Sequence, residues 1–253
     1  MKIFIMPLFT GNEWITAPLL MKFLEELCFS YVNKLNIFET DVNDLFNKVT
    51  LYIVPMINLD GVDLVTENLS TNSNAYINAK NISSYFPDIA FPKGWKANIT
   101  GVDLNLQFPA GWMQAKKIKY SLGFNKPAPR DFVGFGPLTT PEARAIYQFT
   151  LMHNFKLILT YHSQGKVIFW QYQNYAPESS IQIANKFSEV SGYEVADVPY
   201  NSSFAGYKDW FIYYYRQPGF TIEVGIGENP LPISQFNEIY NDNIGILILG
   251  MIL

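Results

Sequence analysis

Three short apolar runs constrain the fold of this 253-residue chain more than any other feature. They lie at residues 2–7, 51–55 and 219–224, and each has the length of a buried strand rather than of a helix. Segments of helical periodicity separate the runs, and strands that alternate with helices are typical of a sheet with parallel strands. The sequence therefore predicts an α/β fold, a three-layer sandwich whose mixed sheet has parallel central strands and helices on both faces.

The remaining elements are predicted from periodicity and from end signals. Thr140, Pro141 and Glu142 combine a capping hydroxyl, a proline at the first helical position and an acid in the first turn, so a helix should begin there. Further strands are predicted at 156–161 and 166–172. Residues 66–98 are interpreted as a long surface excursion and residues 101–112 as a loop. Helices are predicted at 13–33, 43–49, 74–84, 140–153, 177–191, 204–215 and 234–253.

Composition and length exclude several classes of protein. The formal net charge of −4 leaves no basic stripe for nucleic-acid binding, and 253 residues suit one domain over 1–253. The apolar stretch at 244–253 is too short to span a bilayer. The N-terminus lacks the apolar core of a secretory signal, so we expect a cytoplasmic location. Cys28, the only cysteine, falls in a predicted helix and is expected to be a buried structural thiol.

Three side chains suited to acid–base or metal chemistry are expected at one edge of the sheet. Glu13 follows the first strand, His162 closes the strand at 156–161, and Glu223 lies near the end of 219–224. Open α/β sheets keep their sites beyond the carboxyl ends of parallel strands, so the three should meet there. A histidine and a carboxylate on a metal, with a second carboxylate as base, suit metal-assisted hydrolysis. Taken singly, such a histidine is more often a hydrogen-bonded structural residue, and such a glutamate a member of an ion pair.

The local sequences around these side chains point to a family. In order they read GNEWIT at 11–16, PMINLDGV at 55–62, WKAN at 95–98, GVDLN at 101–105, FPAGW at 108–112 and FTIEVG at 220–225. Together they resemble the carboxypeptidase A-like zinc metallopeptidases. Within that family they are most similar to the bacterial γ-D-glutamyl-L-diamino acid endopeptidases, which cleave peptidoglycan stem peptides. The resemblance covers nearly the whole chain.

The resemblance implies one zinc ion and two catalytic side chains. Glu13 matches the glutamate of the family's His-x-x-Glu zinc motif, and His162 matches its distant histidine ligand. Glu223 matches the general base that takes a proton from zinc-bound water. Lys96 falls where the family places a cation against the carbonyl oxyanion.

The resemblance also implies a set of substrate contacts. Asn105 matches a contact to the substrate carboxylate, and Tyr200 lies, with one residue of offset, near a mobile tyrosine that covers the substrate. Lys208 falls at the position that sets side-chain preference, where a lysine would favour an acidic group such as the free carboxylate of a diaminopimelate side arm. The alternative for Lys208 is a solvated surface side chain. Asp103 matches an acid that orients the first histidine ligand.

The chain departs from the family's pattern at the site itself. Thr10 stands where the first zinc histidine is expected, so two protein ligands remain where catalytic zinc normally has three. His153, the only other histidine, ends a predicted helix and is not expected at the site. Leu106 replaces the arginine that would clamp a terminal carboxylate, and Gln107 replaces an asparagine beside it.

Several hypotheses of function remain open. The first is a zinc peptidase that hydrolyses γ-D-glutamyl–diamino acid bonds of peptidoglycan fragments, with water or Thr10 completing the metal shell. The second is an impaired or inactive relative that keeps the cleft as a peptide-binding module or remnant. A structural protein whose cleft has no function is the third. The resemblance also implies an N-terminal hairpin and helix before the first strand, which we expect to be missing here. Their loss would leave the strand at 51–54 at a sheet edge, open to a partner or a second copy.

Overall fold

A six-stranded mixed sheet forms the centre of the molecule. The structure is a computed structural model that describes residues 1–7 and 9–253. Its strands lie in the spatial order β4 (Thr50–Ile53), β1 (Lys2–Pro7), β5 (Leu157–Ser163), β8 (Gly219–Val224), β6 (Val167–Phe169) and β7 (Glu194–Ala196). Strands β1, β4, β5 and β8 are parallel, whereas β6 runs antiparallel to β8 and parallel to β7. The predicted mixed sheet with a parallel centre is confirmed.

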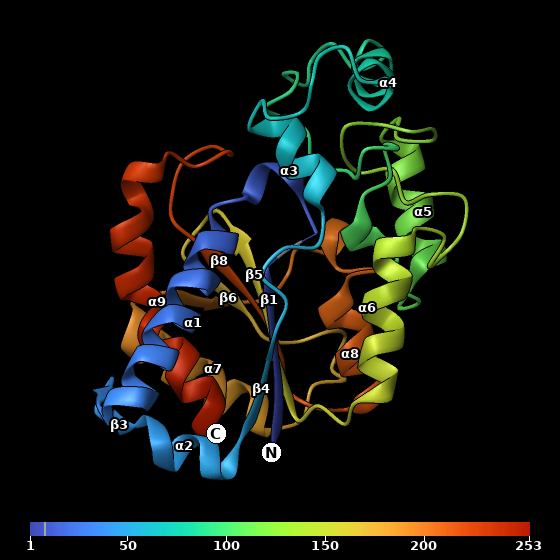
Figure 1. Cartoon of the computed structure of the whole chain (residues 1–253). Helices are drawn as coiled ribbons and strands as arrows, with labels where there is room; N and C mark the ends of the chain where they lie inside the picture. The colour runs from blue at the N-terminus through green and yellow to red at the C-terminus, as the bar shows by residue number, and fades with distance from the viewer. Residues whose placement is uncertain (8) are drawn as a thin grey trace.

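Helices cover both faces of the sheet, as Figure 1 shows. One face carries α1 (Thr16–Asn33), α7 (Ser179–Ser191) and α9 (Phe236–Ile252); the other carries α5 (Trp112–Ser121), α6 (Pro141–Met152) and α8 (Tyr207–Tyr215). Smaller elements are α2 (Val42–Lys48), the hairpin of β2 (Asn36–Ile37) and β3 (Thr40–Asp41), and the 3-10 turns η3 (Tyr200–Ser202) and η4 (Ile233–Gln235). No helix among the described residues is long and apolar enough to cross a membrane.

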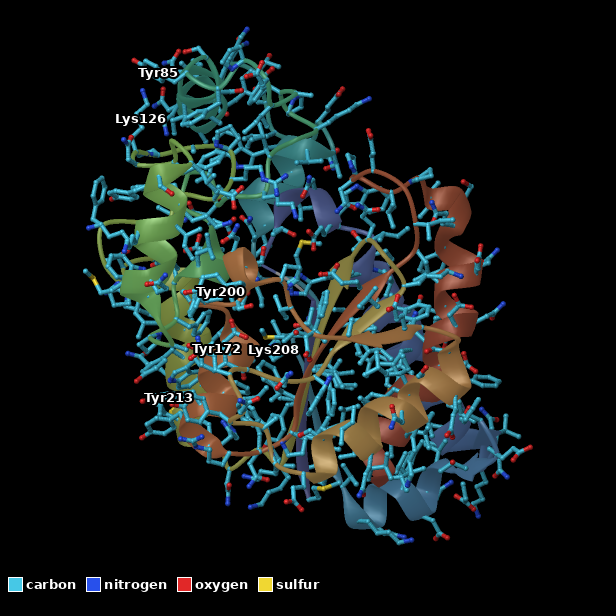
Figure 2. The ribbon with its side chains drawn as sticks, turned by 180° about the vertical axis from the view of Figure 1, so that it is seen from behind. Tyr85, Lys126, Tyr172, Tyr200, Lys208 and Tyr213 are labelled. Atoms are coloured by element: carbon cyan, nitrogen blue, oxygen red, sulfur yellow. The ribbon has the colours of Figure 1, made fainter. Side chains whose placement is uncertain are left out.

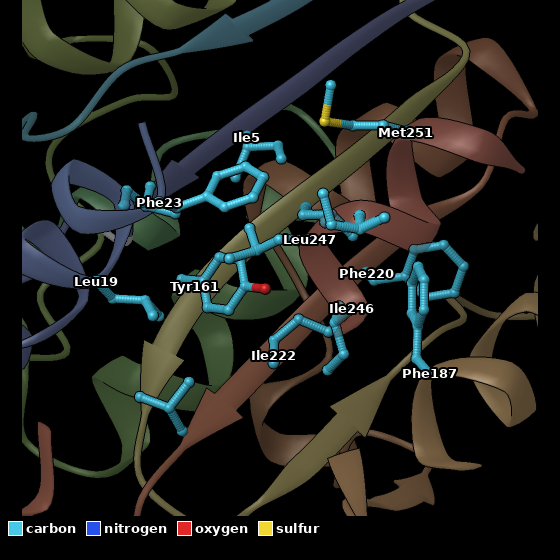
Figure 3. Packing of buried hydrophobic residues seen from close by; sticks show 14 of the residues in the cluster. Ile5, Leu19, Phe23, Tyr161, Phe187, Phe220, Ile222, Ile246, Leu247 and Met251 are labelled. Carbon is cyan, nitrogen blue, oxygen red and sulfur yellow. The ribbon is translucent and has the colours of Figure 1, made fainter. Parts of the chain in front are cut away.

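The core has two parts because the central strands are buried on both faces. Along β1, Ile3 and Ile5 point into one cluster and Phe4 and Met6 into the other, and all four are fully buried. Figure 3 shows the first cluster, in which Ile5 lies near side chains of α1 and α9. A strand that is buried on both faces has a continuous apolar sequence, and this is why the apolar runs predicted these strands.

The carboxyl ends of the parallel strands meet a layer of short elements, drawn at the top of Figure 1. They are η1 (Gly11–Glu13), α3 (Leu59–Val65), α4 (Asn74–Ser83) and η2 (Leu104–Leu106). The buried Asn58 ties the layer together: its side-chain amide donates to the carbonyls of Phe9 and Ala97, and its side-chain oxygen caps α3 at Gly61. This layer fixes the turn that carries Glu13.

Several sequence predictions need correction. Cys28 is exposed. The buried positions of α1 include Leu20, Phe23 and Leu27, and the residue after Leu27 turns about 100° away from them. Residues 66–98 are not only a surface excursion, since Trp95 is fully buried in a small cluster with α3 and α4. Helices α3 and α5 and strand β7 were not predicted. As predicted, β4 lies at an edge of the sheet; a partner there stays a prediction.

Candidate active site

Three sequence-distant segments bring Glu13, His162 and Glu223 together. His162 on β5 is paired in register with Glu223 on β8, and Glu13 lies in η1 after β1. The His162 Nδ1 atom lies 3.6 Å from Glu13 Oε2 and 3.6 Å from Glu223 Oε1. The three side chains therefore meet at the carboxyl ends of the parallel strands, as predicted. Their roles stay predictions.

Glu13 is a buried carboxylate held by charge and by hydrogen bonds. Its side chain is 1% exposed, and the Lys96 ammonium donates to Oε1 at 2.7 Å. The Ser163 backbone N–H donates to Oε2 at 3.2 Å. Burial pushes the pKa of Glu13 up, but the Lys96 ammonium and the Ser163 N–H outweigh it, so the pKa lies below its usual value. Glu13 is therefore ionised at neutral pH.

His162 and Glu223 have pKa values shifted toward their neutral forms. Burial, with help from the positive charges of Lys96 and Lys208, lowers the pKa of His162 to about 4, against the pull of Glu13. The imidazole is thus neutral at pH 7 and able to act as a ligand or hydrogen-bond partner. Burial and the nearby Glu13 carboxylate raise the pKa of Glu223 well above its usual value. A carboxyl with a raised pKa is a stronger base once ionised, which suits proton transfer.

Thr10 faces the same space but offers a neutral oxygen. The residue is 4% exposed and lines a cavity with His162 and Glu223. Its Oγ1 atom is buried and has no hydrogen-bond partner among the described residues. His153 gives no replacement ligand. It caps the end of α6 with Nδ1 2.8 Å from the Phe149 carbonyl, at the end of the molecule where β5 begins.

These donors do not complete the zinc site that the resemblance implies. Two donors on one tetrahedral zinc are roughly 3.4 Å apart, so the 3.6 Å separation of Glu13 and His162 is suitable. A third protein ligand is missing, because Thr10 is a hydroxyl and Lys96 already bonds Glu13. No group of three or more His, Cys, Asp or Glu side chains within residues 1–7 and 9–253 is arranged to hold a metal ion. The residues present do not fit a three-ligand catalytic zinc.

Lys208 lies in a cavity of about 270 Å³ next to His162 and Glu223. The residue is 5% exposed, so the alternative of a solvated surface lysine is wrong. Its ammonium donates to the Gln171 carbonyl at 2.7 Å and to Asp209 Oδ1 at 2.9 Å. The other Asp209 oxygen accepts from the Gly206 N–H at the start of α8. Lys208 is therefore half of a buried, adjacent pair of opposite charges that faces the cavity.

The other predicted substrate contacts differ in position. Asn105 and Leu106 line the cavity of Lys208, but Tyr200 lines a neighbouring cavity of about 320 Å³. Tyr200 is 64% exposed and accepts a hydrogen bond from Gln114. Figure 2 shows Lys208 close to the sheet, with Tyr200 and Tyr213 farther out. The structure thus brings Asn105 and Lys208 to the site, and leaves Tyr200 at its margin.

Two polar residues near the site, Asp103 and Gln107, stabilise the local fold. Asp103 accepts hydrogen bonds from the Asn105 and Asp131 backbone N–H groups and shapes the cavity wall. Gln107 is fully buried; its amide nitrogen donates to the Val133 and Gly136 carbonyls, and its oxygen accepts from Thr139. Gln107 therefore stabilises the loop before α6 and does not face the substrate.

Arg130 is a further cation of the cleft, and it was not predicted from the sequence. Its Nε atom donates to Asp131 at 2.8 Å, and Asp131 also bonds Lys119. Arg130 lines the cavity of Lys208 and a second cavity of about 500 Å³, and both cavities also reach His162 and Glu223. The cleft therefore continues past His162 on both sides. No motif marks Arg130, which lies in an irregular loop, so only the fold reveals it.

Comparisons with known proteins agree with this fold and place the chain in a family. The zinc carboxypeptidase family matches residues 2–245. The γ-D-glutamyl-L-diamino acid endopeptidase 1 of Lysinibacillus sphaericus is 44% identical over 97% of this chain and 60% of its own length. The uncharacterized protein YqgT of Bacillus subtilis (strain 168) is 39% identical over 94% of this chain and 62% of its own length.

Solved structures share the fold at low sequence identity. Bovine thrombin-activatable fibrinolysis inhibitor, in complex with tick carboxypeptidase inhibitor, aligns with a TM-score of 0.69 at 16% identity, over 99% of this chain and 81% of that one. The chain spans about three-fifths of the length of the two curated bacterial relatives. The match over residues 2–245 shows that the chain belongs to the zinc carboxypeptidase family.

Proposed function

We propose that this chain recognises peptides of the γ-D-glutamyl–diamino acid class, such as peptidoglycan stem peptides, in the cleft around His162. One observation carries the proposal: Lys208 and Asp209 form a buried pair of opposite charges in the wall of that cleft. The name of the Lysinibacillus relative supplies the substrate class. Recognition does not depend on a complete metal site, so the proposal stands with the donors that are present.

The buried pair suits a side arm that ends in both an amino and a carboxyl group. Lys208 uses two of its three N–H donors, on Gln171 and Asp209, and keeps one for a ligand carboxylate. Each Asp209 oxygen accepts one hydrogen bond and can accept another from a ligand ammonium. Diaminopimelate has such a side arm, whereas lysine has the ammonium alone. The pair therefore favours diaminopimelate over lysine.

Arg130 supports the same class of ligand from the other wall. Only its Nε atom bonds Asp131, and the side chain is 43% exposed, so its other N–H groups are available to a peptide carboxylate. Leu106 cannot bind a carboxylate, and Arg130 offers a fork of donors in the same cavity.

The test is calorimetric binding of two synthetic peptides, D-glutamate γ-linked to diaminopimelate and the same peptide with lysine. We expect the unmodified chain to bind the first roughly 10- to 100-fold more tightly, the range expected for hydrogen bonds between charged groups. The double variant Lys208→Met/Asp209→Asn removes both charges without leaving one unpaired. It should bind both peptides with similar affinity.

Equal affinity of the unmodified chain for the two peptides would contradict the role of the pair. A chain that binds neither peptide would contradict the proposed function. Val198→Ala is a matched control in the same cavity, because it removes no charge and should keep the preference.

Hydrolysis is a second candidate, favoured by family membership and by the position of Glu223. Glu223 lies in the cleft with a raised pKa and could take a proton from an attacking water. His162 could orient that water as a neutral imidazole. A zinc ion would supply a polarised water, but the donors present do not complete its site. Mass spectrometry of the chain mixed with each peptide and zinc distinguishes the two candidates. Cleavage products that are absent with Glu223→Gln indicate hydrolysis. Intact peptide indicates recognition alone.

A further inference from the structure

The Lys96–Glu13 ion pair holds the buried carboxylate at the centre of the site. The two charged atoms are 2.7 Å apart, and the exposed fractions of the side chains are 21% for Lys96 and 1% for Glu13. A carboxylate buried to this extent requires a counter-charge or a metal ion. The pair is therefore the feature that allows Glu13 to stay ionised without a metal.

The backbone fixes this pair in place. The Gly11 N–H donates to the Lys96 carbonyl at 3.2 Å, which joins the turn of Glu13 to the segment of Lys96. The backbone N–H groups of Lys96 and Ala97 both donate to the Pro129 carbonyl, at 2.8 and 2.9 Å. Because both backbone segments are already held, the ion pair costs only the rotamer entropy of the two side chains.

No second lysine or arginine among the described residues makes an ion pair with Glu13. Thr10 carries no charge, and the His162 Nδ1 atom lies 3.6 Å from Glu13 Oε2, beyond hydrogen-bond distance. Glu223 is a second carboxyl group, and its Oε1 atom lies 3.6 Å from the same His162 nitrogen that Glu13 approaches. Arg130 bonds Asp131 through its Nε atom. Lys96 is thus the cation in direct contact with Glu13 within the described part of the chain.

We propose that Lys96 is the resident cation of this site, an ammonium that takes over the charge-balancing role of a metal ion at Glu13. The Lys96–Glu13 contact then compensates for the replacement of a histidine ligand by Thr10. A neutral third donor weakens metal binding, and the ammonium fills the electrostatic need that remains. A divalent ion at Glu13 would have to displace Lys96 or share the carboxylate with it, at a cost in charge repulsion.

Thermal unfolding with and without excess zinc tests this proposal. The unmodified chain should show no zinc-dependent change in Tm. Lys96→Met leaves Glu13 buried without a counter-charge, and its Tm should fall by roughly 10 °C. Zinc should then raise the Tm of Lys96→Met, because the freed carboxylate and His162 bind the ion in the folded state alone.

Two further variants separate charge from packing. Lys96→Arg keeps the cation and should keep a Tm close to that of the unmodified chain, with no zinc response. Lys96→Met/Glu13→Gln removes both charges, so it should recover much of the lost Tm and should not respond to zinc. If Lys96→Met alone fails to fold while the double variant folds, the counter-charge role is supported in the same way.

The proposal is overturned if zinc stabilises the unmodified chain as much as it stabilises Lys96→Met. It is also overturned if Lys96→Met keeps its Tm or shows no zinc response. A double variant no more stable than Lys96→Met would show that packing, not charge, is lost. The experiment uses no peptide, so its outcome is independent of the peptide recognition proposed above.

Discussion

At the scale of single residues, the partner of a charged side chain decides what that side chain can do. The sequence predicted an available positive charge at both Lys96 and Lys208. Each instead bonds a buried carboxylate, Glu13 in one case and Asp209 in the other. Lys96 and Glu13 are 83 positions apart, so no local pattern indicates their contact. The motifs therefore located these residues, but only the fold defines their charge state and partners.

The Asp131 carboxylate is expected to stabilise the fold in a pH-dependent way. Burial raises its pKa, but Lys119 and Arg130 outweigh burial and lower the net pKa below the usual value. The stabilisation is thus present above the unfolded-state pKa, near 4, and is lost as the pH falls through the lower folded-state pKa. Asp131→Asn should lower the free energy of unfolding at pH 7 by about 2 kcal/mol.

Asn is a suitable replacement because residue 131 has a φ of 65°, a conformation that Asn tolerates well. Urea unfolding of both chains between pH 7 and the acid limit of the fold is the measurement. The difference between the two chains should shrink as the pH falls below 4. A difference that stays constant with pH would show that the ion pairs with Lys119 and Arg130 do not stabilise the cavity wall.

At the scale of elements, the sequence predicts those that depend on local signals. The helix start at Thr140 and Pro141 and the strand at 219–224 lie where they were predicted, because caps and apolar runs are local features. Helix α3 was not predicted, because Asn58 and Gly61 are residue types that favour a turn, whereas Asn58 in fact caps the helix. Cys28 was misplaced because an apolar run does not show which face of a helix packs on the sheet.

Gly11 lies where the turn η1 and helix α3 approach each other closely. A Cβ atom at this position would lie 2.5 Å from the Gly61 carbonyl oxygen, so η1 and α3 approach more closely than a side chain allows. Gly11→Ala should push α3 away from the turn of Glu13 and lower the free energy of unfolding by roughly 1–3 kcal/mol. Gly136→Ala is the matched control, because its Cβ would meet only an ordinary contact of 3.4 Å with Thr139.

Denaturant unfolding of both variants is the measurement for this contact. We expect a loss for Gly11→Ala and a change within about 0.5 kcal/mol for Gly136→Ala. Equal stability of the two variants would show that the layer above the sheet is loosely packed, and that Asn58 does not fix the turn of Glu13.

In the whole molecule, the parallel strands bring together residues from near both ends of the chain and from its middle. These residues meet at the carboxyl ends of the strands. Glu13, His162 and Glu223 meet there because β1, β5 and β8 are adjacent and parallel. This was predictable from the apolar runs and from family resemblance. Two features were not predictable: the second cavity beyond His162, and Arg130 between the two cavities. Both depend on irregular loops, whose paths follow from packing rather than from periodicity.

We propose that the chain keeps the cleft of the zinc carboxypeptidases without a complete metal site among its described residues. Calorimetric titration with zinc, of the unmodified chain and of Thr10→His, is the measurement. We predict weak or undetectable binding by the unmodified chain. Thr10→His should bind more tightly, because a third protein ligand joins Glu13 and His162. Submicromolar zinc binding by the unmodified chain would contradict the claim.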